Sequence, residues 1–188
     1  MVIHSNRIKD KLSVPDENLI YYSGFLSSSL KTIYALENIL SDELNLKVNI
    51  RPFSGRWIRL DPSDQTVISN FRNIAQYNIL GTDAVLGERV WSVQNCFRIM
   101  VGPINRARIA PLLPKGSDEI RIRDIVKTYC GYEYEYELQL LIEKKSVPSS
   151  KLGYNQCNEE PCRLGQTSWV LSSSSLIDRS DAIFLNDE

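Results

Sequence analysis

The hydrophobic residues change their spacing several times along the chain, from the three- and four-residue intervals of a helix to the alternation of a strand. The first apolar stripe begins after Pro15 and ends at the serines 27–29, which predicts a short N-terminal helix. A longer helix is predicted to end near Leu44. Val48 and Ile50 then alternate with polar residues, as in a half-buried strand.

The next segments predict further strands. We expect residues 56–60 to form a short strand that closes a hairpin with residues 48–50, since Ser54-Gly55 makes a turn between them. Residues 96–101 alternate again, and we expect Gly102-Pro103 to end that strand.

The second half repeats the change from helix to strand. A short helix over 104–113 is followed by a longer one with Ser117 as its predicted N-cap and Gly131 at its C-terminal end. The strongest strand of the sequence is predicted over 132–142, where tyrosines and leucines alternate with glutamates. A last strand is expected near 182–185.

Two stretches, 30–87 and 118–171, share an order of parts: a helix, a two-periodic strand, a polar connection and a Leu-Gly pair before a short apolar segment. This order suggests a duplication, although helix followed by strand also recurs by chance. We therefore expect an α+β protein with two small lobes of helix plus antiparallel strands, related by duplication, after an N-terminal helix. The expected boundaries are 1–28 for the N-terminal arm and helix, 29–102 for the first lobe and 103–188 for the second.

The composition is that of an ordinary globular protein. Of 188 residues, 43% are hydrophobic and 24% charged, and the net charge is -1 with both signs interspersed. This balance gives no basic face for nucleic acid. No apolar run approaches the ~20 residues needed to cross a bilayer, and the N-terminus lacks the apolar segment of a signal peptide. We expect a cytoplasmic protein with no direct membrane insertion.

The sequence offers little catalytic or metal chemistry. His4 is the only histidine, so Ser-His-Asp and Cys-His arrangements have no convincing base. No glycine motif that cradles phosphate is present. Cys157 and Cys162 form a C-x4-C pair, which is not the spacing of a zinc knuckle, although a redox role stays open. We expect no enzyme activity, no metal and no cofactor.

One carboxylate cluster supports an alternative function. Glu133, Glu135 and Glu137 fall on one face of the predicted strand. They either form a solvated face opposite the tyrosines, which we favour, or serve a small hydrolase or ligand-binding domain.

The stretch LGTDAVLGERVW, residues 80–91, holds two Leu-Gly pairs six residues apart and ends in Trp91, and LGQTSWVL at 164–171 is a shorter echo. The glycines either fix the shape of a loop or only punctuate turns. The tryptophans either anchor a core or meet a partner, since Trp, Tyr and Arg dominate binding hot spots. We assign structural turns to Gly55, Gly81, Gly87, Gly102, Gly131 and Gly165.

Several of these landmarks together resemble the C-terminal part of TssG, also called ImpH or VasB, a baseplate subunit of type VI secretion systems. They span about residues 16–184 in the family's order. The chain departs from the family pattern in lacking the longer N-terminal region, in a cysteine-containing insertion at 154–162, and in lacking the glycine that commonly follows the final Trp segment. The segments that carry the resemblance are 22–26 (YSGFL), 36–44 (LENILSDEL), 48–60 with F-x-GRW, 80–91, FRI with GP at 97–103, RDIV at 123–126, and LGQTSW at 164–169.

The resemblance implies a structural role without catalysis. In the family, one TssG subunit sits with two TssF copies in a wedge, alongside TssE, and two related lobes each recruit a TssK trimer, which links the baseplate to the membrane complex. A cytoplasmic location at the inner membrane, through the secretion assembly, is implied as well. An adaptor unrelated to secretion remains a further alternative. From the resemblance we expect the two Leu-Gly loops to shape or form partner contacts through Asp83, Val85, Leu86, Arg89, Trp91, Gln166, Ser168 and Trp169.

Overall fold

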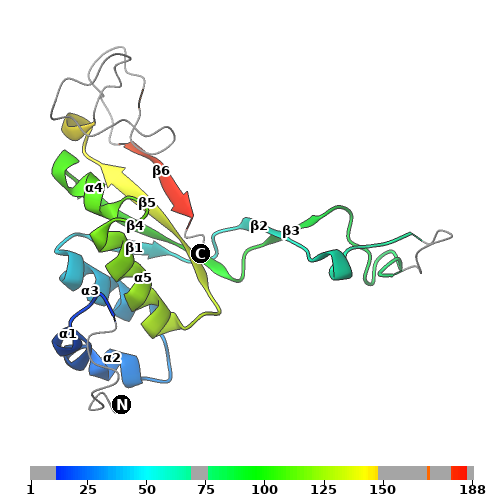
Figure 1. The fold of residues 1–188 in the computed structure, drawn as a ribbon, viewed down its shortest axis with the longest axis horizontal. Coiled ribbons are helices and arrows are strands. Elements are labelled where there is room, and N and C mark those ends of the chain that lie inside the picture. The colour runs from blue at the N-terminus through cyan, green and yellow to red at the C-terminus, as the bar shows by residue number, and fades with distance from the viewer. Residues whose placement is uncertain (1–11, 69–75, 148–168, 170–178, 186–188) are drawn as a thin grey trace. The chain divides into compact units, whose positions relative to one another are not determined.

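The computed structural model describes residues 12–68, 76–147, 169 and 179–185 (Figure 1). Its contacts divide the chain into two compact units. We call Met1–Arg51 with Phe97–Glu188 the core unit, and Pro52–Cys96 the ribbon.

The core unit is α+β. Its helices and strands, in chain order, are α1 (Asp16–Tyr21), α2 (Ser23–Ser27), α3 (Ile33–Leu44), β1 (Val48–Arg51), β4 (Cys96–Ile104), α4 (Ile109–Leu112), α5 (Ser117–Cys130), β5 (Glu135–Ile142) and β6 (Arg179–Leu185), with short 3-10 turns η2 (Arg106–Arg108) and η3 (Lys144–Ser146). The predicted N-terminal helix is therefore two short helices that meet at Tyr22. The helix predicted to begin with Ser117 as N-cap begins at that residue, with Gly116 as the cap.

Four strands form one sheet in the order β1-β4-β5-β6. β1 and β4 are antiparallel with Val48 opposite Val101, and β5 and β6 are antiparallel with Leu138 opposite Phe184. The two central strands, β4 and β5, are parallel to each other, since residue numbers increase in the same direction along both strands at their contacts. Arg98 Nε bonds the carboxylate of Glu137, and six residues further along each strand the Glu143 amide donates to the Ile104 carbonyl at 3.2 Å.

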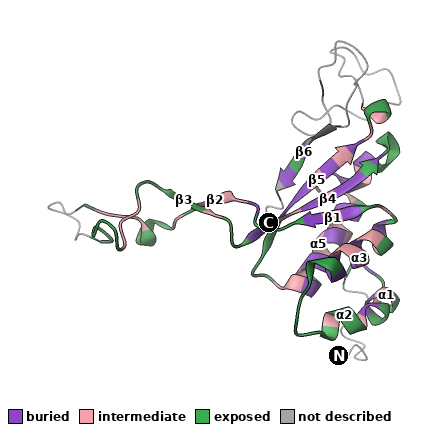
Figure 2. Ribbon diagram, turned by 180° about the vertical axis from the view of Figure 1, so that it is seen from behind, coloured by how far each residue is buried: buried purple, intermediate pink, exposed green. Residues whose placement is uncertain are grey.

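The helices bury one face of this sheet. α3 packs on β1 and on α5, and α4 packs on α5. Figure 2 shows the buried positions following β1, β4 and β5 and the inner sides of the helices. The most deeply buried large side chains are Ile39, Leu40, Ile99, Ile104, Leu112, Ile122, Leu140 and Ile142. The predicted apolar stripe of α5 is confirmed, since Ile122, Ile125, Val126 and Tyr129 are all buried.

The outer edge of β1 is covered by side chains of α3. The Val48 amide donates to Ser41 Oγ at 3.3 Å, and the Ile50 amide donates to Glu37 Oε1 at 2.7 Å. An open strand edge invites pairing with other chains, so these two bonds satisfy the edge and protect it.

Two strand predictions were wrong. The predicted hairpin between 48–50 and 56–60 does not form, since β1 pairs with β4 and residues 56–59 pair with residues 89–92. The reason is burial: Val48 and Ile50 lie opposite Val101 and Ile99, whose side chains reach the same core, whereas residues 56–59 are only half-buried or exposed.

β4 also does not end at Gly102-Pro103. It continues to Ile104, because the Gly102 amide donates to the Lys47 carbonyl at 2.9 Å and the Ile104 carbonyl accepts the bond from Glu143. Pro103, which has no amide proton to donate, is exposed between them.

The division of the chain differs from the expected lobes 29–102 and 103–188. Strands of both expected lobes share one sheet, and the ribbon separates from them. The order of helix, strand, long connection and antiparallel partner strand nevertheless occurs twice, as α3-β1-ribbon-β4 and as α5-β5-β6 with residues 143–178 between the strands. A duplication remains our interpretation of that order.

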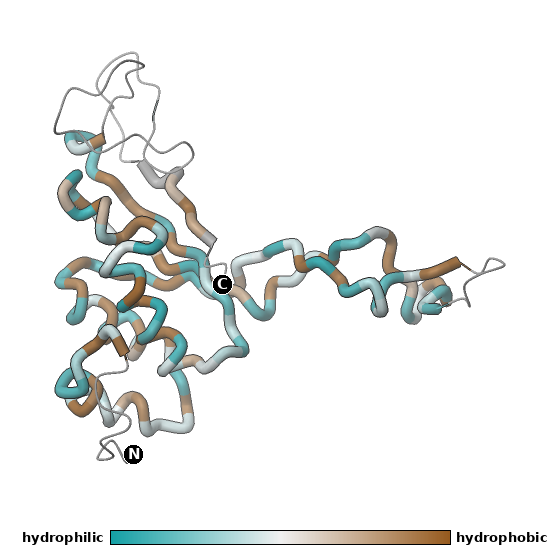
Figure 3. Tube along the Cα trace, in the orientation of Figure 1, coloured by the Kyte–Doolittle hydropathy of each residue, from teal (hydrophilic) through white to brown (hydrophobic). Residues whose placement is uncertain are grey.

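The ribbon is built around two short antiparallel strands, β2 (Arg56–Arg59) and β3 (Arg89–Ser92). Residues 60–88 connect them and include the 3-10 turn η1 (Pro62–Asp64). Among the ribbon residues that the structure describes, only Ser54 and Cys96 are buried. Figure 3 shows that hydrophobic positions nevertheless recur along it. The ribbon therefore folds with hardly any core of its own.

Candidate functional site

The two tryptophans of the ribbon face each other across β2 and β3. Trp57 lies opposite Trp91, with ring centroids 5.4 Å apart and the ring planes at 67°, an edge-to-face contact. The Leu60 amide bonds the Glu88 carbonyl at 2.9 Å, which makes 57/91 and 59/89 the non-hydrogen-bonded pairs, where side chains approach most closely. Although the rings stabilise each other, Trp57 is 60% exposed and Trp91 is 52% exposed.

Gly55 fixes the orientation of Trp91. A Cβ atom at residue 55 would overlap Cζ2 of the Trp91 indole, so the ring rests on bare backbone. Any side chain at residue 55 would displace it. Trp91 therefore supports the ribbon through one edge of its ring and presents the remainder to solvent.

Asp83 and Val85 shape the connection between the strands. Asp83 Oδ1 accepts a hydrogen bond from the Ile79 amide at 2.8 Å, and the Ile79 carbonyl accepts from the amides of residues 82–84. The Val85 amide donates to Thr66 Oγ1 at 3.0 Å, which ties the two sides of the connection together. Gly81 lies within this turn and Gly87 follows it, with φ values of +84° and +96°, where other residues are strained.

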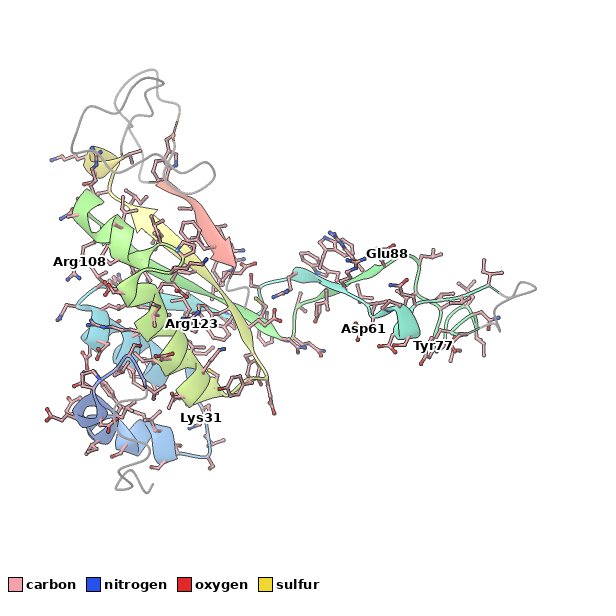
Figure 4. The ribbon with its side chains drawn as sticks, in the orientation of Figure 1. Lys31, Asp61, Tyr77, Glu88, Arg108 and Arg123 are labelled. Carbon is pink, nitrogen blue, oxygen red and sulfur yellow. The ribbon has the colours of Figure 1, made fainter. Side chains whose placement is uncertain are left out.

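Large apolar side chains on this shaped connection point into solvent. Leu86 is 95% exposed and Leu80 is 89% exposed. Ile68 and Ile79 of the connection are exposed as well, and so is Phe53, which precedes β2. Figure 4 shows the ribbon side chains, with Asp61, Tyr77 and Glu88 labelled. Because so few ribbon residues are buried, these side chains have no core to fill, and such exposure marks an interaction surface.

Exposed apolar residues also occur in the N-terminal part of the core unit. They lie on α1, on α2 and around the beginning of α3: Ile20, Tyr21, Phe25, Leu30, Ile33 and Tyr34. Beneath them Leu19, Tyr22, Leu36 and Leu40 are buried. This part of the surface therefore covers a core, unlike the ribbon.

The expected C-terminal contact loop is represented only by Trp169. That side chain is partly buried and packs against the core cluster, so it supports the fold of the core unit. Gln166, Ser168 and Gly165 lie outside the described residues, as do Cys157 and Cys162.

The three glutamates of the alternative site do not share one environment. Glu133 and Glu135 are exposed, but Glu137 is buried and its Oε2 lies 2.6 Å from Nη2 of Arg98. The expectation of a solvated carboxylate face is therefore wrong for Glu137, because the parallel register brings Arg98 beside it. The carboxylate of Glu137 is thus engaged in an ion pair with Arg98, whereas the alternative hydrolytic site would need it for catalysis.

Other chemistry is sparse in the described segments. No group of three or more His, Cys, Asp or Glu residues there is arranged to hold a metal ion. No helix among those residues is long and apolar enough to cross a membrane. Burial raises the pKa of the Cys130 thiol, which disfavours the reactive thiolate.

Sequence reasoning missed part of the ribbon surface. It selected Leu86, Arg89 and Trp91 but omitted Trp57 and Leu80 from the contact residues. Trp57 is recognised as a contact residue by its position opposite Trp91. That position can be found only if β2 is known to pair with a strand more than thirty residues away. Leu80 had a signal in the sequence, since it precedes Gly81 just as Leu86 precedes Gly87.

Comparisons with known proteins place this fold. No curated protein matches the sequence. A chain of a cryo-electron microscopy structure of the type VI secretion system TssK-TssF-TssG baseplate subcomplex superimposes with a TM-score of 0.67 at 15% identity, covering 93% of this chain and 71% of that one. A chain of the baseplate complex from the type VI secretion system superimposes with a TM-score of 0.59 at 14% identity, covering 98% of this chain and 49% of that one. The family model for TssG of type VI secretion matches residues 3–171, and the chain belongs to this family.

Proposed function

We propose that this protein is a structural, non-enzymatic subunit of a type VI secretion baseplate, and that the ribbon is the element that docks a TssK-like partner. The observation that carries the proposal is the ribbon itself. It has an ordered turn, a fixed tryptophan pair and exposed large apolar side chains, and only Ser54 and Cys96 are buried among its described residues. An isolated two-stranded ribbon is marginally stable in water, so burial of these side chains against a partner surface would stabilise it.

The core unit would supply the remaining contacts. The similar baseplate subcomplex combines TssK and TssF with TssG, so TssF-like subunits are the proposed partners of the core unit, and a TssE-like subunit is a further one. Such a role implies a location in the cytoplasm, at the inner membrane through the assembly.

A second docking element is part of the proposal. Residues 143–178 connect β5 to β6 as the ribbon connects β1 to β4, so the two connections are topologically equivalent. In this duplicated arrangement, each connection meets one copy of the TssK-like partner. Loss of the ribbon contact would then weaken recruitment while leaving one contact in place.

The test is co-purification of the whole chain with its TssK-like and TssF-like partners. Substitution of both ribbon tryptophans by alanine should reduce recovery of the TssK-like partner, since buried aromatic anchors often contribute more than ~2 kcal/mol each. Recovery of the TssF-like partner should not change. The matched control is Tyr132→Ala, which removes an exposed aromatic from the core unit.

The outcomes separate cleanly. If the double variant is folded, as judged by circular dichroism, and still recovers the TssK-like partner at the control level, the ribbon is not its docking element. Obligate interfaces commonly bury ~2,000 Å² or more, so the loss of two side chains should reduce binding only in part. The amount of co-purified TssK-like partner must therefore be quantified, because its mere presence or absence would not show a partial loss.

A further inference from the structure

One face of the ribbon strands combines the two tryptophans with two arginines. Residues 57 and 59 of β2 and residues 89 and 91 of β3 alternate onto the same face, because side chains of a strand repeat every second residue. That face therefore presents Trp57 opposite Trp91 and, one step along, Arg59 opposite Arg89.

The two arginines stand in an unfavourable position. Like charges directly opposite each other across two strands are destabilising, and the non-hydrogen-bonded pairs hold side chains closest. Of the ribbon residues that the structure describes, only Ser54 and Cys96 are buried, so little packing is present to offset this repulsion. Proteins break such local rules mainly at functional sites.

The ribbon's own carboxylates relieve this repulsion only in part. Glu88 Oε2 lies 3.5 Å from Nη2 of Arg59, but both side chains are mostly exposed, so this ion pair is weak. Within the described part of the chain, Arg89 forms no ion pair and its side chain is exposed. The guanidinium group of Arg89 is thus available to a partner beside the exposed indole of Trp91.

We propose that the protein surface that receives the ribbon presents carboxylates to Arg59 and Arg89, next to an apolar recess that takes Trp57 and Trp91. This inference rests on the proposed docking role of the ribbon and adds the chemistry of its partner. Arginine forms directional, charge-assisted bonds with carboxylates, so these contacts fix the register of the tryptophans in the recess. A nucleic acid partner is disfavoured, since the net charge is -1 and acidic residues are interspersed with the basic ones.

The experiment measures the Kd between the whole chain and its TssK-like partner at about 0.1 M and about 1 M salt, over which the Debye length falls from about 10 Å to about 3 Å. For the unmodified chain we expect affinity to fall at least tenfold over this range. Arg89→Glu and Arg59→Glu should each weaken binding at low salt by tenfold or more and flatten the salt dependence. Arg106→Glu, an exposed arginine of the core unit, is the matched control and should change neither.

The melting temperature of Arg89→Glu shows whether a loss of binding comes from misfolding. Arg89→Glu replaces a like-charge pair by an opposite pair with Arg59, so it should not lower the melting temperature. Binding of the Arg89→Glu protein should be regained by a partner variant in which one acidic surface residue is changed to lysine. A scan of the partner's acidic residues that restores no binding overturns the carboxylate assignment.

The outcomes distinguish the inference from the proposed function beneath it. If alanine at Trp57 and Trp91 weakens binding but the arginine reversals do not, the ribbon docks and the acidic partner surface is wrong. If neither set of variants changes the Kd, the docking role of the ribbon itself fails. Binding of a labelled oligonucleotide that is lost in Arg89→Glu, with no effect on the protein partner, also overturns the inference.

Discussion

Arg98 on β4 and Glu137 on β5 form an ion pair in which two nitrogens of the guanidinium share one carboxylate oxygen, with Nη2 at 2.6 Å and Nε at 2.7 Å from Oε2. The side chains are 23% and 9% exposed. The pair joins the two halves of the sheet at its parallel junction, and it forms only in the observed register.

Arg98→Met should therefore destabilise the core unit, because it removes the guanidinium group that pairs with the buried carboxylate of Glu137. We expect a loss of about 2–4 kcal/mol in the free energy of unfolding, measured by urea denaturation. The double variant Arg98→Met, Glu137→Leu should lose less than the single variants Arg98→Met and Glu137→Leu together, since each of them already breaks the same ion pair. Additive losses in the double variant would show that the two groups do not interact.

Two buried tyrosines offer a matched comparison of hydrogen bonds. Tyr129 of α5 donates to the Thr32 carbonyl at 3.0 Å and accepts from the Thr32 amide at 2.8 Å, which connects α5 to the N-terminus of α3. The hydroxyl of Tyr136 is buried and has no hydrogen-bond partner among the described residues. Tyr129→Phe should cost about 1–3 kcal/mol in unfolding free energy, whereas Tyr136→Phe should cost nothing or stabilise the protein.

Equal losses from these two substitutions in parallel urea titrations would contradict the hydrogen-bond assignment. Both variants remove the same oxygen from a buried ring, so the difference between them isolates the bonds to Thr32.

Alkaline pH should destabilise the protein through Tyr136. Burial raises the pKa of its phenol above the ordinary value of 10.0, and the negative charge of Glu119 adds to this while Arg123 opposes it. Because the folded state disfavours the phenolate, the contribution to stability is complete below pH 10 and is lost as the pH rises above the pKa of the unfolded chain. Unfolding measured from pH 9 upward should show a steeper loss in the unmodified protein than in Tyr136→Phe. Parallel curves would assign the alkaline loss to other groups.

Gly55→Ala should disturb the ribbon selectively. The added methyl group overlaps the Trp91 indole, so the edge-to-face contact with Trp57 should be lost and the near-ultraviolet circular dichroism of the tryptophans should change. Gly24→Ala is the control, because a Cβ atom there has no neighbour within 4 Å in the described structure. An unchanged tryptophan signal in Gly55→Ala would mean that the ring does not rest on residue 55.

The sequence predicted the helices and strands better than it predicted which strands pair with each other. The helix ending at Leu44 and the buried stripe of α5 follow from local periodicity, and both are observed. A strand is also observed at Glu135–Ile142, but its alternation is broken where Tyr136, Glu137 and Leu138 are all buried. The partner of β1 was wrong, because pairing depends on which distant strand buries its side chains in the same core. The burial of Glu137 was missed for the same reason, since its cause is an arginine thirty-nine positions earlier.

The candidate site was partly predictable. Repeated Leu-Gly pairs before a Trp indicated a shaped loop, and the loop residues Asp83 and Val85 hold a hydrogen-bonded turn. The stretch alone could not reveal that Leu86 lies in solvent or that Arg89 faces Arg59. The first depends on how few of the described ribbon residues are buried, and the second depends on the register of β2 with β3.

Hydrogen exchange tests the docking role of the ribbon most directly. In the free chain, the ribbon amides should exchange faster than those of β4 and β5, because few ribbon side chains are buried around its hydrogen bonds. Addition of the TssK-like partner should slow exchange across residues 52–68 and 76–96 and leave β5 unchanged. Protection confined to α1, α2 and the beginning of α3, with the ribbon as fast as in the free chain, would contradict the account.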